Sequence, residues 1–321
     1  MNAPRTRVVR RPVHGVLLLD KPLGWSSNDA LQKCKWLLRA DKAGHTGTLD
    51  PLATGVLPLC FGAATKFSQL QLDADKTYEA TLRLGLKTST GDAEGDVIET
   101  RDVHVTQADI DRVALQFQGT IRQTPPMYSA LKKDGKPLYE YARAGIHIDR
   151  EPREIKIHKL NLSKADIEQG KFAIKLEVTC SKGTYIRTLG EDIGEALGCG
   201  AHLSQLRRVG TGDFKQDQCV TLDDFLALDD AQRLKRLLPV QALLQGHVNV
   251  TLDAEQSGRF LSGLRRRGNW PDAPSVAVYG PPPEKNLLGA AHIEAGELIP
   301  TRLLSPVEIE QIEALKKEST P

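Results

Sequence analysis

Two stretches of alternating apolar and polar residues constrain the fold of this 321-residue chain most strongly. Residues 77–87 place Tyr78 and several aliphatic residues on one face of an extended chain, with polar side chains on the other. Residues 172–180 repeat the pattern, with Phe172, Ile174 and every second residue to Cys180 on one side. Strict alternation is typical of a strand with one buried face. Both stretches therefore predict strands of a sheet that covers an apolar core.

Helical spacing alternates along the chain with these strands. Ser26 followed by Asp29, and Thr106 followed by Asp109, predict capped helix starts. A third helix is expected after residue 180. The expected core faces of the three helices are Ala30, Leu31, Cys34, Leu37 and Leu38; Ile110, Val113, Ala114 and Phe117; and Ile186, Leu189, Ile193 and Leu197. Because regular βαβ units are missing and hairpin signals are present, the order predicts an α+β fold.

Composition shifts along the chain predict its domains. Residues 1–13 read as a flexible basic tail, residues 14–246 as the main domain and residues 247–321 as a small β-rich domain. The last boundary falls where helical spacing stops and short strands divided by Gly and Pro begin. Within the main domain, the tyrosine-rich and basic residues 124–154 predict a projecting insertion with a short helix near residues 138–144.

The overall charge is nearly balanced, with 43 Lys and Arg against 41 Asp and Glu. This is not the strongly basic composition of a domain that binds nucleic acid through bulk charge. Any RNA contact would have to come from local basic clusters, at residues 1–12, 132–159, 207–208 and 265–267. Composition alone leaves open whether these clusters bind RNA or are solvated surface.

The cysteines and the apolar segments indicate in which cellular compartment the protein is expected. The five cysteines show no CxxC spacing, so neither a disulfide framework nor a zinc ribbon is expected. No apolar run approaches the roughly 20 residues of a membrane helix, and the N-terminus lacks the pattern of a signal peptide. We therefore expect a cytoplasmic protein without a membrane partner.

The segment from residue 44 to residue 57, GHTGTLDPLATGVL, carries the strongest functional signal. Its only acidic residue, Asp50, lies among glycines and threonines, next to a single histidine. An Asp before Pro usually caps a turn. A carboxylate on a loop held by a rigid scaffold can also serve a binding or catalytic pocket. The residues by themselves allow both interpretations.

The whole segment resembles the catalytic-aspartate motif of the TruB-type tRNA pseudouridine synthases. Further segments resemble the same family in family order: GVLLLDKPLGWSSND (15–29), KTYEATLRLG (76–85), QTPPMYSALK (123–132) and GTYIRTLGEDIG (183–194). The resemblance implies a pseudouridine-synthase core with a mixed, mostly antiparallel sheet and a PUA-like C-terminal RNA-binding domain. A related branch acts with guide RNAs; the absence of a long Lys-rich tail favours the bacterial, stand-alone type, expected to be a monomer.

The resemblance also assigns roles to individual residues. It implies that Asp50 is the nucleophile, that Arg187 is its ionic partner, and that Tyr78 stacks on the target base or takes a proton from the sugar. Substrate-binding roles are implied for His45, Tyr185, Leu206 and Lys21. Each residue also has an ordinary alternative: Tyr78 and Leu206 could simply pack in the core, and Arg187 could open a solvent-facing helix.

The implied reaction turns uridine 55 in the T-loop of tRNA into pseudouridine. No atoms are gained or lost, so no cofactor and no metal are expected, and GxGxxG after a strand, GxxxxGK[ST] and HExxH are missing from the sequence. Whether the carboxylate acts at C1′, through a glycal, or at C6 of the base stays open. The alternative from another class is a tRNA-binding protein that refolds the T-arm without catalysis; an enzyme for free uridine is a weaker third hypothesis.

Overall fold

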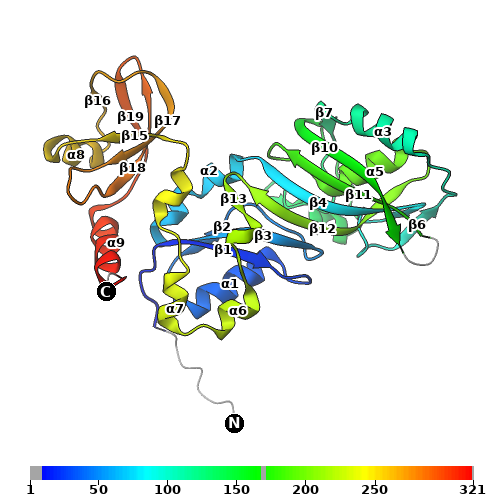
Figure 1. The fold of residues 1–321 in the computed structure, drawn as a ribbon, viewed down its shortest axis with the longest axis horizontal. Coiled ribbons are helices and arrows are strands. Elements are labelled where there is room, and N and C mark those ends of the chain that lie inside the picture. The colour runs from blue at the N-terminus through cyan, green and yellow to red at the C-terminus, as the bar shows by residue number, and fades with distance from the viewer. Residues whose placement is uncertain (1–8, 168–170, 320–321) are drawn as a thin grey trace, which may run out of the picture.

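The computed structural model describes residues 9–167 and 171–319. A long mixed sheet runs through the molecule in the order β14–β1–β3–β12–β4–β11–β10–β7 (Figure 1). Its β1–β14 and β3–β12 pairs are parallel and the other pairs along this path are antiparallel, which confirms the α+β prediction. These strands span Gly15–Lys21 (β1), Ala53–Phe61 (β3), Lys76–Leu84 (β4), Gly119–Gln123 (β7), Arg153–Ile167 (β10), Lys171–Cys180 (β11), Ala201–Thr211 (β12) and Val220–Thr221 (β14).

Helices cover the sheet in two groups. Near β1 and β3, α1 (Ser27–Leu37) and α6 (Leu222–Ala227) close one apolar cluster; α3 (Gln107–Gln116) and α5 (Ile186–Ala196) close another on β4, β10 and β11. The capping box expected at Thr106 is present. The predicted core face of α1 is buried throughout, as are Ile186, Leu189 and Ile193 of α5. Helical spacing therefore identified the correct faces.

Smaller elements complete the main domain. They are β2 (Ala43–His45), η1 (Gly62–Phe67), α2 (Ser68–Asp73), β5 (Leu86–Thr88), β6 (Val97–Thr100), β13 (Phe214–Lys215), η2 (Gln216–Gln218), α7 (Asp230–Lys235) and η3 (Val240–Leu244). Among them, β2 pairs with the far end of β3, and β5 pairs with β6 in a separate ribbon.

Phe172 does not point into the core, so this part of the strand prediction was wrong. The residue is 58% exposed, and the apolar cluster begins only at Ile174. Phe172 pairs with Asp166 near the tip of the β10–β11 hairpin. Alternation gives the face of a strand but not the point at which the covering helices end, so the first apolar residue of the stretch lies beyond the core.

Part of the predicted N-terminal tail, residues 1–13, contacts the main domain. Residues 1–8 of this segment lie outside the described part. The amide of Arg11 donates to the carbonyl of Arg39, the Arg11 guanidinium pairs with Asp230 at 2.6 Å, and Val13 is buried. The prediction of flexibility is therefore wrong for residues 11–13.

The basic pair at residues 207–208 is not a surface cluster either. Arg208 is only 1% exposed. Arg207 forms an ion pair with Asp20 at 2.6 Å, from the neighbouring part of the same sheet. Neighbouring residues of a strand point to opposite faces, so two adjacent arginines in the sequence do not make one charged patch.

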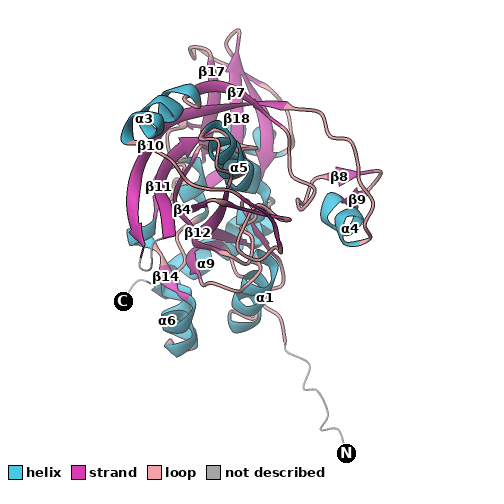
Figure 2. Ribbon diagram, turned by 90° about the vertical axis from the view of Figure 1, so that its right-hand side faces the viewer, coloured by secondary structure: helices cyan, strands magenta, loops and turns pink. Residues whose placement is uncertain are grey.

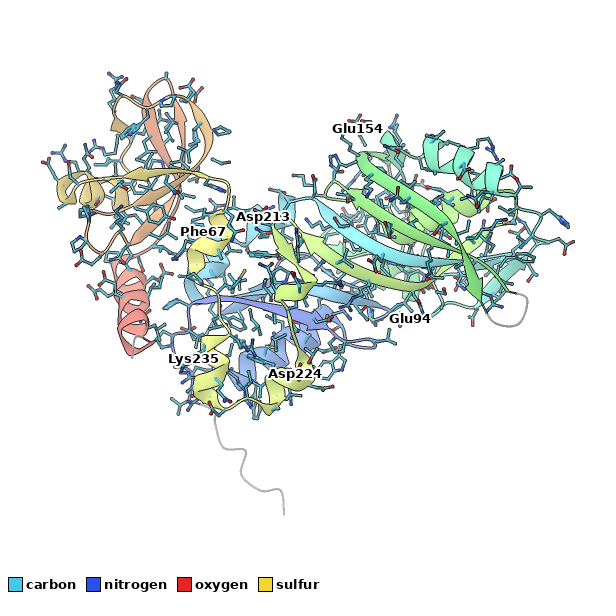
Figure 3. The ribbon with its side chains drawn as sticks, in the orientation of Figure 1. Phe67, Glu94, Glu154, Asp213, Asp224 and Lys235 are labelled. Carbon is cyan, nitrogen blue, oxygen red and sulfur yellow. The ribbon has the colours of Figure 1, made fainter. Side chains whose placement is uncertain are left out.

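A second sheet, in the order β15–β17–β18–β19–β16, forms the C-terminal part (Figure 1). Its elements are β15 (Val248–Thr251), α8 (Ala254–Leu261), β16 (Arg266–Arg267), β17 (Ala273–Tyr279), β18 (Leu287–Glu294), β19 (Glu297–Leu303) and α9 (Pro306–Ser319). One apolar cluster is internal to this part. Another joins it to the main sheet: Ala277 and Leu287 pack with Val16 and with Phe67, which Figure 3 labels at this junction.

The insertion between β7 and β10 projects from the body of the molecule (Figure 2). It holds the short strands β8 (Lys132–Lys133) and β9 (Lys136–Pro137) and the helix α4 (Leu138–Arg143). The predicted short helix is therefore present. Within the described ranges, none of the helices combines the length and apolar character that a membrane crossing requires.

Candidate active site

Asp50 lies on the loop between β2 and β3, and neighbouring segments fix this loop at several points. The Ser27 hydroxyl exchanges hydrogen bonds with the Leu49 backbone, at 2.7 and 3.0 Å. The amide of Gly24 donates to the carbonyl of Pro51 at 2.9 Å, and Leu49 is buried. The Asp50 side chain is 41% exposed. The loop thus presents one accessible carboxylate from a fixed backbone.

Arg187, in the first turn of α5, is the ionic partner of Asp50. Its Nη2 atom lies 3.0 Å from Oδ2 of Asp50, and its side chain is only 7% exposed. The guanidinium also binds two backbone carbonyls: Nη1 donates to the Thr90 carbonyl at 3.0 Å, and Nη2 donates to the Tyr128 carbonyl at 2.5 Å. A guanidinium held by several fixed acceptors has little freedom to leave the carboxylate.

Asp92 is a second carboxylate beside Arg187, and the sequence analysis missed it. Its Oδ2 atom lies 3.6 Å from Nε of Arg187, and its side chain is 4% exposed. The Thr90 hydroxyl and the Glu94 amide donate to the other oxygen, at 2.6 and 3.1 Å. Asp92 lies in the acidic loop that follows β5. Its sequence gives no sign that one carboxylate turns inward while Glu94 stays exposed.

Two further charged groups lie in the electrostatic field of Asp50. Lys21 is fully buried, and its Nζ donates to the carbonyls of Pro22 and Trp25 at 3.0 and 2.6 Å. Burial lowers the pKa of Lys21 to about 8, against the opposing effect of Asp50 and Glu94. Partial desolvation of the exposed Glu94 side chain, followed by the charges of Asp92 and Asp50, raises its pKa. Glu94 lies beneath the β4–β12 region in Figure 3.

Tyr78 lies on β4, between Val178 of β11 and Arg208 of β12. Its ring packs against both apolar clusters of the main sheet. Burial raises the pKa of the Tyr78 phenol, and the neighbouring Arg208 guanidinium opposes this rise. The structure thus places Tyr78 at the junction of the two halves of the sheet, within the field of Asp50.

Tyr185 precedes α5 and is fixed by a residue that the sequence analysis did not single out. The side-chain amide of Gln123 accepts from the Tyr185 amide at 2.8 Å and donates to its carbonyl at 3.1 Å. Burial raises the pKa of the Tyr185 phenol, while the Ser129 side chain opposes the rise. Gln123 opens the QTPPMYSALK segment, but its contact across the fold has no local signature.

The remaining predicted residues lie around the Asp50 loop. Leu206 of β12 pairs with Ala53, just after the loop, and packs against both apolar clusters. His45 ends β2, just before the loop. Its Nδ1 atom is buried without a hydrogen-bond partner among the described residues, and burial, then Arg208, lowers its pKa. All seven predicted residues therefore lie on the Asp50 loop or on segments that adjoin it.

Solved structures share the fold of this chain. A solved structure described as "Crystal Structure of a Cbf5-Nop10-Gar1 Complex" aligns with a TM-score of 0.66 and 27% identity, over 91% of this chain and 84% of that chain. One described as "Structure of H/ACA RNP bound to a substrate RNA containing 2'-deoxyuridine" has a TM-score of 0.67 at 24% identity, covers 92% and 86%, and shows the likeness of fold alone.

The sequence comparisons specify the family. Residues 35–186 match the "TruB family pseudouridylate synthase (N terminal domain)", and residues 187–245 match the "tRNA pseudouridylate synthase B C-terminal domain". The chain belongs to the TruB family. Proteins named tRNA pseudouridine synthase B from Verminephrobacter eiseniae (strain EF01-2) and Cupriavidus metallidurans (strain ATCC 43123 / DSM 2839 / NBRC 102507 / CH34) are 63% and 58% identical, covering 97% and 93% of this chain and 94% and 96% of theirs. The strands of the region matched as C-terminal, β12, β13 and β14, belong to the main sheet here.

Proposed function

We propose that this protein isomerises uridine 55 in the T-loop of tRNA to pseudouridine, with Asp50 as the nucleophile. The ion pair between Asp50 and Arg187 carries the proposal, because it joins an accessible carboxylate to a buried cation at 3.0 Å. Family membership and the names of the relatives supply the reaction and the substrate. A carboxylate can attack carbon and later leave, which divides a difficult reaction into easier steps.

The reaction breaks the bond between N1 and C1′ and forms one between C5 and C1′. On the route we favour, the Asp50 carboxylate attacks C1′ while N1 leaves with the bonding electron pair, or a base removes a C2′ proton to give a glycal. The freed uracil turns and C5 attacks C1′, while the Asp50–C1′ bond breaks and its electron pair returns to the carboxylate; on the glycal route C2′ instead regains its proton. C5 then loses its proton and N1 gains one. Because atoms and electrons balance within the substrate, no cofactor or metal is required. A C6 adduct on the reaction path would contradict this route.

Arg187 has an electrostatic role in this scheme. A carboxylate in a pocket closed by a flipped base loses hydration, which favours protonation. The guanidinium at 3.0 Å opposes that effect and fixes the direction of the attacking oxygen. Asp92 lies near the Nε atom of Arg187 and holds the guanidinium in position. Tyr78 is the proposed base at C2′, and it also stacks on the uracil.

The other predicted residues receive substrate-binding roles. An enzyme that acts on a base takes the base out of its stack, and His45 fills the place that it leaves. Tyr185 and Leu206 line the uracil pocket, and Lys21 supports the loop beside Asp50. The insertion at residues 124–154 closes over the RNA loop, and basic clusters of the C-terminal domain contact phosphates. We further propose that the protein acts as a cytoplasmic monomer, without a guide RNA.

Tritium release tests the proposal. An unmodified tRNA transcript with tritium at C5 of uridine is incubated with the purified protein in excess EDTA. Release by the wild type, and none by Asp50→Asn at equal tRNA binding, is the expected result. If folded protein binds the tRNA without releasing tritium, but refolds the T-arm equally well as wild type and as Asp50→Asn, the protein is a tRNA-folding factor instead.

A further inference from the structure

Arg208 is a buried cation at the centre of the main sheet. It lies on β12, which Figure 1 shows between β3 and β4. Its backbone pairs with Tyr78 on one side and with Gly55 on the other. Arg208 is therefore the residue of β12 that stands between the tyrosine of the site and the strand that follows the Asp50 loop.

The Arg208 side chain binds the backbone on both sides of Asp50. Its Nε atom donates to the carbonyl of Val56 at 2.7 Å, and its Nη2 atom donates to the carbonyl of Gly47 at 3.3 Å. Gly47 precedes Asp50 in the loop, and Val56 follows it in β3. One planar guanidinium thus connects the two stems of the loop, which a lysine ammonium cannot reproduce with the same geometry.

Two glycines of the segment provide the space for this residue. Gly47 has a φ of +87°, and a Cβ atom there would lie 3.3 Å from Nη1 of Arg208. Gly55 has a φ of +101°, and a Cβ atom there would lie 2.2 Å from the Arg208 carbonyl oxygen. The spacing of glycines around Asp50 therefore matches the close approach of Arg208 as well as the turn itself.

The charge of Arg208 is not neutralised by a neighbouring acid. In the part of the chain that the structure describes, no carboxylate lies within ion-pair distance of its guanidinium, which is 1% exposed. A buried cation without an anionic partner is costly. A role for the field or the geometry of Arg208 would account for this cost.

We propose that Arg208 is a positioning residue of the isomerisation, which holds both stems of the Asp50 loop and orients the Tyr78 phenol beside it. The inference rests on the proposed function. Tyr78 is faced by Arg208 from β12, by Cys180 from β11 and by Asp50 from its loop. Arg208 is the cation among them, and it lowers the pKa of the phenol against burial. If Tyr78 acts as a base, loss of this cation moves the active phenolate form to higher pH.

The test compares Arg208→Lys with Arg207→Lys. Arg207 is the matched control, because it is adjacent in the chain but faces the other side of the sheet and pairs with Asp20. Both are assayed for folding by circular dichroism, for tRNA binding, and for single-turnover tritium release across pH. Arg208→Lys should lower the rate by about 100-fold, the size expected for a small misplacement of a reacting group, with tRNA affinity within about threefold of the wild type.

A combined variant separates positioning from a general loss of structure. If Arg208 acts in part through the phenol, Arg208→Lys should lower the rate less in a Tyr78→Phe background than in the wild type. Arg208→Gln removes the cation itself, so its activity should rise at a higher pH than that of the matched Arg207→Gln variant. A wild-type rate in folded Arg208→Lys, together with an unshifted pH profile in folded Arg208→Gln, overturns the inference. Absence of tritium release from the wild type instead refutes the proposed function.

Discussion

Arg187 lies between two carboxylates of different accessibility: Asp50 is 41% exposed at 3.0 Å, and Asp92 is 4% exposed at 3.6 Å. One carboxylate is free to meet a substrate, while the other is occupied by the Thr90 hydroxyl and the Glu94 amide. This difference in exposure supports the reacting role proposed for Asp50 and a supporting role for Asp92.

We predict that Asp92→Asn lowers the single-turnover rate by about 10- to 100-fold, because Arg187 loses the charge that holds its Nε side. Binding of tRNA should stay within a few fold, since Asp92 is buried. Asp96→Asn, an exposed position on the same loop, is the control and should leave the rate unchanged. Equal rates for the two variants would show that Asp92 is not needed to hold Arg187 in place.

Tyr78→Phe separates the two proposed roles of the ring. Removal of the hydroxyl should lower the rate of tritium release by about 100-fold or more if it takes the C2′ proton, with tRNA affinity kept because the ring is still present. Rapid quench at saturating enzyme measures the rate, and filter binding measures the affinity. A rate close to that of the wild type would leave stacking as the role of Tyr78.

The depressed pKa of Lys21 predicts how stability depends on pH. Burial lowers this pKa from 10.5 to about 8, so between these values the unfolded chain holds more protons than the folded one. Stability must then rise with pH across this window. From pH 8 to pH 10, the wild type should gain about 2 kcal/mol in unfolding free energy relative to Lys21→Met.

Urea unfolding at the two pH values measures this gain. Other groups that titrate in the window, Lys76 among them, are common to both proteins and cancel in the difference. Lys159→Met, at an exposed position on β10, should follow the wild type. Parallel pH curves for the wild type and Lys21→Met would mean that Lys21 is not desolvated in solution.

The arginine cluster at residues 265–267 tests the proposed role of the C-terminal domain. Replacing all three arginines by glutamine should weaken tRNA binding and lower the salt slope of the binding constant by about 1 for each phosphate that the protein no longer neutralises. The rate at saturation should not change. Arg112→Gln, on the exposed side of α3, is the control. Substitutions suit this test better than deletion, since deletion would expose Val16 and Phe67 of the shared cluster.

Local patterns in the sequence predicted much of the fold. The faces of α1 and α5 followed from helical spacing, and the start of α3 from Thr106 and Asp109, because these signals act within one turn or one face of an element. The prediction that Phe172 points into the core was wrong because the extent of the covering layer is a property of the whole fold. The contacts of residues 11–13 were not predicted because their partners, Arg39 and Asp230, are distant in sequence.

Some residues of the candidate site were predicted from the sequence, and others were not. The segment around Asp50 was recognisable as a unit, and the family resemblance implied that Arg187 is the ionic partner of Asp50. Asp92, Gln123 and Arg208 were missed, because each acts on a residue of another element: Asp92 on Arg187, Gln123 on Tyr185, and Arg208 on the loop stems. Only the three-dimensional arrangement reveals these supporting residues.

The apolar cluster that joins the two sheets bears on how the substrate is selected. Since Ala277 and Leu287 share a core with Val16 and Phe67, and Lys66 bonds Glu308 of α9 at 2.6 Å, the two parts cannot move apart without opening that core. For an RNA that contacts both parts, the protein would therefore fix the distance between the two points of contact. The dimensions of the RNA between the reacting uridine and the distant contact would then count as much as its base sequence.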